Sequence, residues 1–279
     1  MSGHLPTIVI VHGAWHSPEH YQVLASRLRS QGYKTVTPGL PTVHYASQGT
    51  PPPRSLSEDI NAIRKAIQAG LDTDPTTDVI LLAHSYGSLP ASPAIQDLDK
   101  STRLKSGHSN GIVAFLVIAG PLIPEGTSGW IWWGSQYPPI LKMSKLKDED
   151  GSETEIETST PASPPGPLAL LYHDLPTDEA EKYVAMLKPH VFNGHYDQIT
   201  FAGYLAVPTY YLICEEDQAL PKQFQQMIVD SADKDIAETG QRAVVVTRIG
   251  SGHSPFLSRV EETGDWVKRC AKQASSLAI

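Results

Sequence analysis

The chain has 279 residues, enough to bury the core of one large domain or of two small ones. Its composition, with 40% hydrophobic and 19% charged residues, is typical of a soluble globular protein. Its net charge of −8 argues against nucleic acid or an anionic membrane surface as a partner. No apolar run approaches the roughly 20 residues of a membrane-spanning helix, and we see no secretory signal. We therefore expect a soluble, cytoplasmic protein, and its two cysteines, which form no CxxC pair, agree with that.

Short apolar runs alternate with segments of helical spacing along most of the chain. In chain order they predict a strand over 7–11, a helix over 18–31, a strand over 34–37, a helix over 57–70, a strand over 78–83, a helix over 86–97 and a strand over 111–119. After residue 205 they predict a strand over 207–214, a helix over 221–231, a strand over 243–249 and a helix over 255–271. Strict alternation of this kind predicts a mostly parallel sheet of about six strands with helices on both faces.

Residues 121–205 break this rhythm. They contain three tryptophans, many prolines and an acidic stretch, and only residues 178–187 have clear helical spacing. We expect residues 144–167 to be either the edge of a lid or a disordered loop. An insertion after the carboxyl end of a strand lies over the place where open α/β sheets bind ligands. We therefore expect a core of residues 1–120 and 206–279 with an inserted cap or lid of residues 121–205.

A serine directly follows the third predicted strand, in the sequence VILLAHSYGS. Ala83, Ser85 and Gly87 match the G-x-S-x-G pattern of a nucleophile elbow, except that alanine replaces the first glycine. The buried strand before the serine and the helix-length segment after it supply the context that an elbow needs. The pattern predicts that Ser85 is a nucleophile; the alternative is a serine that only caps the helix.

Two later strand ends carry the partners that a nucleophilic serine needs. The sequence GSGHSP follows the last predicted strand, and we expect its His253 to be the base; the alternative is a loop histidine without a role. The sequence CEEDQALP follows the strand before that one. We expect Asp217 to be the acid that orients the imidazole, with Glu216 and then Glu215 as alternatives.

Two turns are expected to supply backbone donors for an oxyanion. One donor is the N–H of Tyr86, and the other is the N–H of Ala14 in the sequence HGAW, which is alternatively only a tight turn. The side chains expected to line a substrate pocket around them are His12, Gly13, Trp15, His84, Trp130, Trp132 and Trp133. For the last three, packing within the cap is an equally good interpretation.

Three histidines spaced by four, His12, His16 and His20, raise the question of a metal site. Gly13 and Pro18 interrupt the helix that such spacing needs, and no HExxH motif is present. We therefore expect neither a metal nor an organic cofactor.

The sequences HGAWHSPEHY, AHSYG, GPLIPEGTS, YLICEEDQALP and GSGHSPFLS together resemble the α/β-hydrolase superfamily. Within it they are most similar to the small plant methylesterase and hydroxynitrile-lyase group and its fungal relatives. The resemblance covers nearly the whole chain and is weakest over residues 129–205. It implies the α/β-hydrolase fold, with Ser85 as nucleophile, Asp217 as acid and His253 as base, in the chain order of that fold. Ala83 and Pro90 depart from the family pattern.

The resemblance also separates two kinds of chemistry. Hydroxynitrile lyases of this group have a threonine and a lysine where this chain has Gly13 and Ser254, so their site is not reproduced. We therefore expect a serine hydrolase that cleaves a carboxylic ester, lactone or thioester of a small, largely apolar metabolite through an acyl-enzyme. The alternatives are a lyase or cyclase that acts on a natural product with the same residues, and a non-catalytic protein that binds a small molecule.

Overall fold

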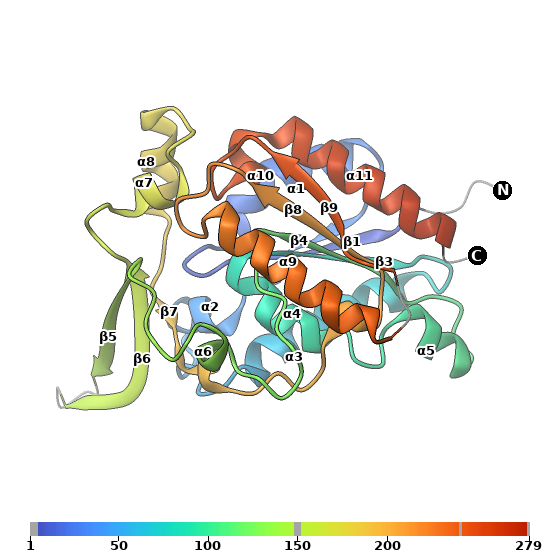
Figure 1. Cartoon of the computed structure of the whole chain (residues 1–279), viewed down its shortest axis with the longest axis horizontal. Coiled ribbons are helices and arrows are strands. Elements are labelled where there is room, and N and C mark those ends of the chain that lie inside the picture. The colour runs from blue at the N-terminus through green and yellow to red at the C-terminus, as the bar shows by residue number, and fades with distance from the viewer. Residues whose placement is uncertain (1–4, 148–151, 240–241, 278–279) are drawn as a thin grey trace.

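The computed structural model describes residues 5–147, 152–239 and 242–277. Its centre is a six-stranded sheet with the strand order β2-β1-β3-β4-β8-β9, in which every neighbouring pair is parallel (Figure 1). The strands are β1 (Thr7–Val11), β2 (Thr35–Val36), β3 (Val79–His84), β4 (Ile112–Ile118), β8 (Thr209–Cys214) and β9 (Val245–Ile249). The predicted mostly parallel sheet of about six strands is confirmed.

Helices cover both faces of this sheet (Figure 1). The five that pack most closely on it are α1 (Gln22–Ser30), α3 (Ser57–Thr73), α4 (Ser88–Ala94), α9 (Lys222–Ala237) and α11 (Val260–Leu277). Buried apolar residues join α3, α4 and α9 to one face and α1 and α11 to the other. Because both faces are covered, β1, β3, β4 and β8 are buried over their whole length, which explains their continuous apolar sequences. No helix within the described ranges is both long and apolar enough to cross a membrane.

Two helical predictions need correction. The segment between the strand expected over 34–37 and the helix expected over 57–70, for which no element is predicted, contains α2 (Pro41–Gln48), which has a proline in its first turn and ends at Gly49 in the left-handed conformation. Proline and glycine there mark the two ends of a helix. The helix expected over 86–97 is a 3-10 turn, η2 (Ser85–Gly87), followed by α4, which ends at Ala94. Pro93 lies inside α4 and has no N–H to donate, which shortens the helix.

Residues 121–205 contain a second, smaller sheet beside the first. Its strands are β5 (Leu141–Lys147), β6 (Glu153–Pro161) and β7 (His190–Val191), and they pair antiparallel. The same segment holds the short helices α6 (Gly129–Trp132), α7 (Pro167–Leu171), α8 (Thr177–Ala185), η3 (Asn193–Tyr196) and η4 (Gly203–Leu205). Helix α8 confirms the helix predicted over 178–187. The remaining short helices of the chain are η1 (Pro18–Tyr21), α5 (Lys100–Lys105) and α10 (Pro255–Ser258).

The β5–β6 hairpin occupies part of residues 144–167, where we expected a lid edge or a disordered loop. Its two strands project at one side of the molecule (Figure 1). Strand β5 is exposed or half-buried, whereas β6 buries Ile156, Thr158 and Ser159. An exposed strand such as β5 needs no apolar alternation, and two of the three buried residues of β6 are polar, so the sequence pattern does not reveal either strand. Opposite charges face each other across the pair instead, with Lys145 opposite Glu157 and Lys147 opposite Glu153. Residues 148–151, also in that expectation, lie outside the described residues.

Candidate active site

Ser85 occupies a sharp turn between β3 and α4. Its φ of 52° lies in the left-handed region, which a residue with a side chain rarely adopts. At Gly87 a Cβ atom would lie 2.5 Å from the carbonyl oxygen of His12 and 2.9 Å from that of Val11, so only glycine fits there. Ala83 is fully buried between Val11 of β1 and Val117 of β4, and this site accepts its methyl group. The turn therefore has the geometry of a nucleophile elbow.

His253 and Asp217 form a buried pair. The Nδ1–H of His253 donates to Oδ2 of Asp217 over 2.7 Å, and the two side chains are 3% and 0% exposed. With its proton on Nδ1, the neutral imidazole has a free lone pair on Nε2. The ring is thus in the tautomer that a general base for a serine hydroxyl requires.

The Asp217 carboxylate is held in one orientation from three sides. Its Oδ1 accepts from the backbone N–H groups of Ala219 and Leu220, both over 2.8 Å, and its Oδ2 also accepts from Nε2 of Gln225 over 3.1 Å. Of the three acidic residues considered from the sequence, Asp217 is the one that contacts His253. Glu215 and Glu216 are exposed, and Glu215 lies 4.0 Å from Arg248.

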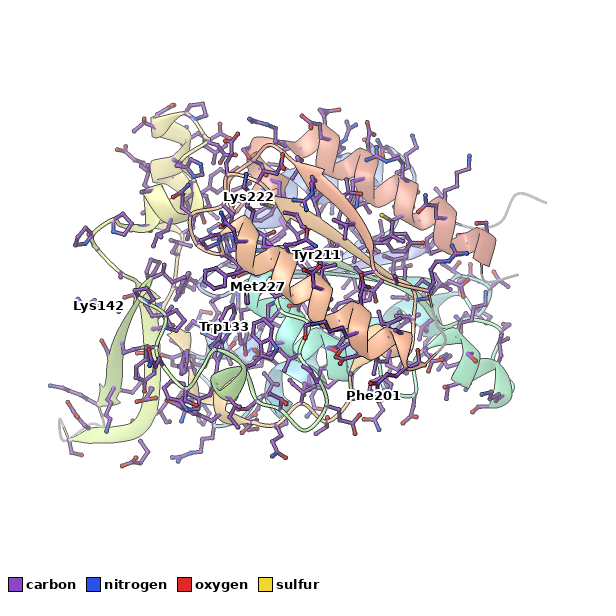
Figure 2. The ribbon with its side chains drawn as sticks, viewed as in Figure 1. Trp133, Lys142, Phe201, Tyr211, Lys222 and Met227 are labelled. Carbon is purple, nitrogen blue, oxygen red and sulfur yellow. The ribbon has the colours of Figure 1, made fainter. Side chains whose placement is uncertain are left out.

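Ser85 and His253 line the same cavity, which has a volume of about 550 Å³. Most of its wall is apolar; among the residues expected there, Ala14, Trp15, Tyr86, Trp130 and Trp133 line it. Figure 2 shows Trp133 on the side of the molecule where α9 carries Lys222 and Met227. The other four residues expected to line the pocket are not part of the cavity wall: His12, Gly13, His84 and Trp132.

Two backbone N–H groups are available beside Ser85. Tyr86 is the second residue of η2, so its N–H has no acceptor within the turn. The Ala14 N–H donates to no acceptor among the described residues. Gly13 lets this loop lie close to His84 and Ser85, because a Cβ atom at Gly13 would lie 2.9 Å from His84 Nδ1 and 3.1 Å from Ser85 Cβ. The arrangement offers the two donors that an oxyanion needs.

The hydroxyl of Tyr21 connects three loops beneath the cavity. It accepts from the N–H of Gly13 over 3.1 Å and donates to Nδ1 of His84 over 2.7 Å. Nε2–H of His84 in turn donates to the carbonyl oxygen of His253 over 3.0 Å. Burial lowers the pKa of His84 well below its usual value, so the ring stays neutral and can accept and donate at once. One buried network therefore fixes the Gly13 turn, the serine turn and the His253 loop together.

We expect Tyr21→Phe to lower the free energy of unfolding by about 2–4 kcal/mol, because it leaves two buried polar groups without a partner. The matched control is Tyr33→Phe, since Tyr33 is also buried but its hydroxyl makes no hydrogen bond within the described part of the chain. Urea unfolding of both variants checks this. Equal stability of the two variants would show that the network does not hold the loops.

Asp59 is a fully buried acid behind the serine turn. It accepts from the hydroxyl of Tyr86 over 2.9 Å, and from the N–H and hydroxyl of Thr42 over 3.0 and 2.6 Å. Burial raises the pKa of Asp59 to about 6, although these three donors, which favour the ionised form, lower it. Its ionised form holds the ring of the residue that follows the candidate nucleophile.

Asp59 predicts a pH dependence of stability. Because its pKa is higher in the folded protein, the native state binds the proton more tightly, and this stabilisation is lost as the pH rises through about 6. Between pH 4 and 7 we expect the unfolding free energy of the wild type to fall by about 2 kcal/mol relative to Asp59→Asn. Urea unfolding of both proteins across this range measures the difference, and a constant difference would contradict the prediction.

The three evenly spaced histidines have protein partners. His12 Nε2 accepts from the N–H of Leu40, His16 bonds the Ala14 carbonyl and the Tyr172 hydroxyl, and His20 bonds Ser17 and the Tyr183 carbonyl. Among the residues that the structure describes, no group of three or more His, Cys, Asp or Glu side chains could hold a metal ion. The spacing of these histidines therefore serves packing of the first loop.

The sequence did not indicate a role in the site for four polar residues near the cavity: Tyr21, Asp59, His190 and His195. Tyr21 and Asp59 reach the serine turn only through tertiary contacts. His190 and His195 lie on β7 and η3, in the segment without strand or helix patterns. The one available signal was their polarity next to apolar Val191 and Phe192, which does not point to a cavity.

Comparisons with known proteins show the family and the fold of this chain. A family model described as the alpha/beta hydrolase family matches residues 8–266. Alpha/beta hydrolase nvfD of Aspergillus novofumigatus is 30% identical over 98% of both chains, and methylesterase 1 of Arabidopsis thaliana is 21% identical over 94% of this chain and 95% of its own. The crystal structure of polyneuridine aldehyde esterase superposes with a TM-score of 0.71 at 18% identity, covering 97% of this chain and 99% of the other.

Proposed function

The chain belongs to the alpha/beta hydrolase family, and on that premise we propose that it is a serine hydrolase that cleaves a carboxylic ester, lactone or thioester of a small, largely apolar metabolite. The observation that carries the proposal is the buried Asp217–His253 hydrogen bond in a cavity that Ser85 also lines. Relatives of this chain include esterases by name, and the fold is the one that the sequence resemblance implied.

The proposed reaction begins when Nε2 of His253 takes the proton of Ser85 as its Oγ attacks the substrate carbonyl. Asp217 keeps the imidazole in its reactive tautomer and stabilises the imidazolium that forms. The N–H groups of Ala14 and Tyr86 stabilise the oxyanion; losing one such donor typically costs about 2.7–4 kcal/mol of barrier. His253 then gives its proton to the leaving group, and water resolves the acyl-enzyme with His253 again as base.

Residues 121–205 act in this proposal as the cap over the sheet of residues 1–120 and 206–279. The cap supplies much of the cavity wall, including Trp130, Trp133, Ile140 and Phe192. An apolar wall favours an apolar acyl or alcohol group, and the volume of about 550 Å³ is within the range of sites for drug-sized ligands.

A panel of methyl esters, lactones and acyl thioesters of aromatic and alicyclic acids tests the proposal. Acid release by the wild type, and its loss in Ser85→Ala, is the expected result. Turnover that persists in a correctly folded Ser85→Ala protein would favour a lyase or cyclase that needs no acyl-enzyme. Tight binding of a panel member without product would favour a binding protein.

A further inference from the structure

His190 and His195 are two polar side chains in a cavity wall that is mostly apolar. Both line the cavity that contains Ser85 and His253. Their ring centroids lie 4.2 and 5.1 Å from that of Tyr86 and 5.8 Å from each other. They therefore form a pair directly beside the residue that follows the candidate nucleophile.

Neither imidazole has a hydrogen-bond partner among the residues that the structure describes. Nε2 of His190 and Nδ1 of His195 are fully buried and unpaired, and His190 as a whole is 1% exposed. The Tyr86 hydroxyl donates to Asp59, and it forms no hydrogen bond with either imidazole among the described residues. Burying a polar group without a hydrogen bond is costly, so a built-in pair of this kind indicates a polar group that arrives with a ligand.

The charge state of the pair limits what that group can be. Burial lowers the pKa of His195 to about 3 and that of His190 well below its usual value, so both rings are neutral near pH 7. A neutral imidazole offers one N–H donor and one acceptor. Two such rings complement a neutral oxygen, which a hydroxyl or ketone supplies, better than they complement a carboxylate.

We propose that His190 and His195 form a specificity subsite that binds a hydroxyl or ketone oxygen of the substrate next to its scissile carbonyl. This inference rests on the proposed hydrolase function, because it places the oxygenated part of the substrate in the same cavity. It narrows the substrate class from apolar esters to apolar ring compounds that carry a neutral oxygen function. The wall near the pair includes the apolar side chains of Leu89 and Phe192, and the Ser159 hydroxyl opposite His190 accepts from the Trp15 indole N–H. An ester without that oxygen therefore leaves both rings unpaired.

A kinetic experiment compares methyl naphthoate with a series of methyl hydroxynaphthoates and acetylnaphthoates in which the substituent moves around the ring. For the wild type we expect kcat/KM of the best oxygenated ester to exceed that of the parent ester about tenfold or more. In the double variant His190→Leu, His195→Leu the ratio should approach one. His108→Leu, an exposed histidine far from the cavity wall, should keep the wild-type ratio. A wild-type ratio near one for every position would overturn the subsite.

A binding experiment separates failure of the subsite from failure of the hydrolase function. Ser85→Ala is titrated with the same esters, and quenching of Trp130 and Trp133 in the cavity wall reports binding. We expect the best oxygenated ester to bind about tenfold more tightly than the parent, and the advantage to vanish when both leucines are added. Equal binding of all esters would overturn the subsite even if the enzyme proved to be a hydrolase. A clear preference without any turnover would uphold the subsite and overturn the hydrolase function.

The stability of the leucine variants distinguishes a binding role of the two histidines from a structural one. Because the two rings have no protein partner, the leucine variants should unfold at the same urea concentration as the wild type or at a higher one. A clear loss of stability would show that the histidines hold the fold. The variant His190→Gln, which keeps a donor and an acceptor, should retain part of the preference for oxygenated esters.

Discussion

Replacing Ser85 by alanine is expected to lower kcat/KM for the best ester substrate by about a millionfold. The variant lacks the proposed attacking atom, while the proposed oxyanion donors of Ala14 and Tyr86 and the cavity remain. The residual rate then reflects binding and electrostatic stabilisation alone. The turn itself should survive, since alanine keeps the Cβ atom that the serine already carries at a φ of 52° and adds no bulk.

Steady-state kinetics with a sensitive fluorogenic ester measures this loss. The matched control is Ser106→Ala, an exposed serine after α5 that should leave kcat/KM unchanged. A loss smaller than about tenfold in Ser85→Ala would mean that Ser85 does not form the acyl-enzyme.

Asp217→Asn is expected to lower kcat by about ten-thousandfold without unfolding the protein. The amide oxygen will take the place of Oδ1, because the N–H groups of Ala219 and Leu220 donate there. The amide NH₂ then faces Nδ1 of His253, which must become the acceptor and move its own proton to Nε2. A histidine protonated at Nε2 cannot take the proton of Ser85.

Glu216→Gln is the matched control for Asp217→Asn. It makes the same chemical change one residue earlier, on an exposed side chain that does not contact His253. Its kcat should stay within about twofold of the wild type. Equal effects of the two substitutions would contradict the assignment of Asp217 as the acid that orients His253.

The core of the fold was predictable because its signals are local. Each strand of the large sheet is a short apolar run that ends in a turn, and Ser85, Asp217 and His253 each follow such an end. Parallel strands place their carboxyl ends at one edge of a sheet, so sequence order alone predicted that these residues meet. The choice of Asp217 over its neighbours Glu215 and Glu216 needed the structure, since all three share the loop.

The cavity wall was much less predictable. Many of its residues come from residues 121–205, whose strands lack apolar alternation; in the β5–β6 pair, opposite charges face each other at Lys145 and Glu157. The position of His190 depends on pairing of β7 with β6, which joins Ser159 to His190 across the sequence. No local pattern encodes such a contact. The same applies to Tyr21, whose hydroxyl joins Gly13 to His84 only after the chain has folded.

The most direct test of the central claim is the intact mass of the protein after treatment with a fluorophosphonate. A fluorophosphonate phosphonylates only a serine that a neighbouring base activates. We predict one adduct on the wild type, located at Ser85, and none on Ser85→Ala. A folded wild-type protein that forms no adduct, or an adduct that persists in Ser85→Ala, would contradict the assignment of Ser85 as the activated nucleophile.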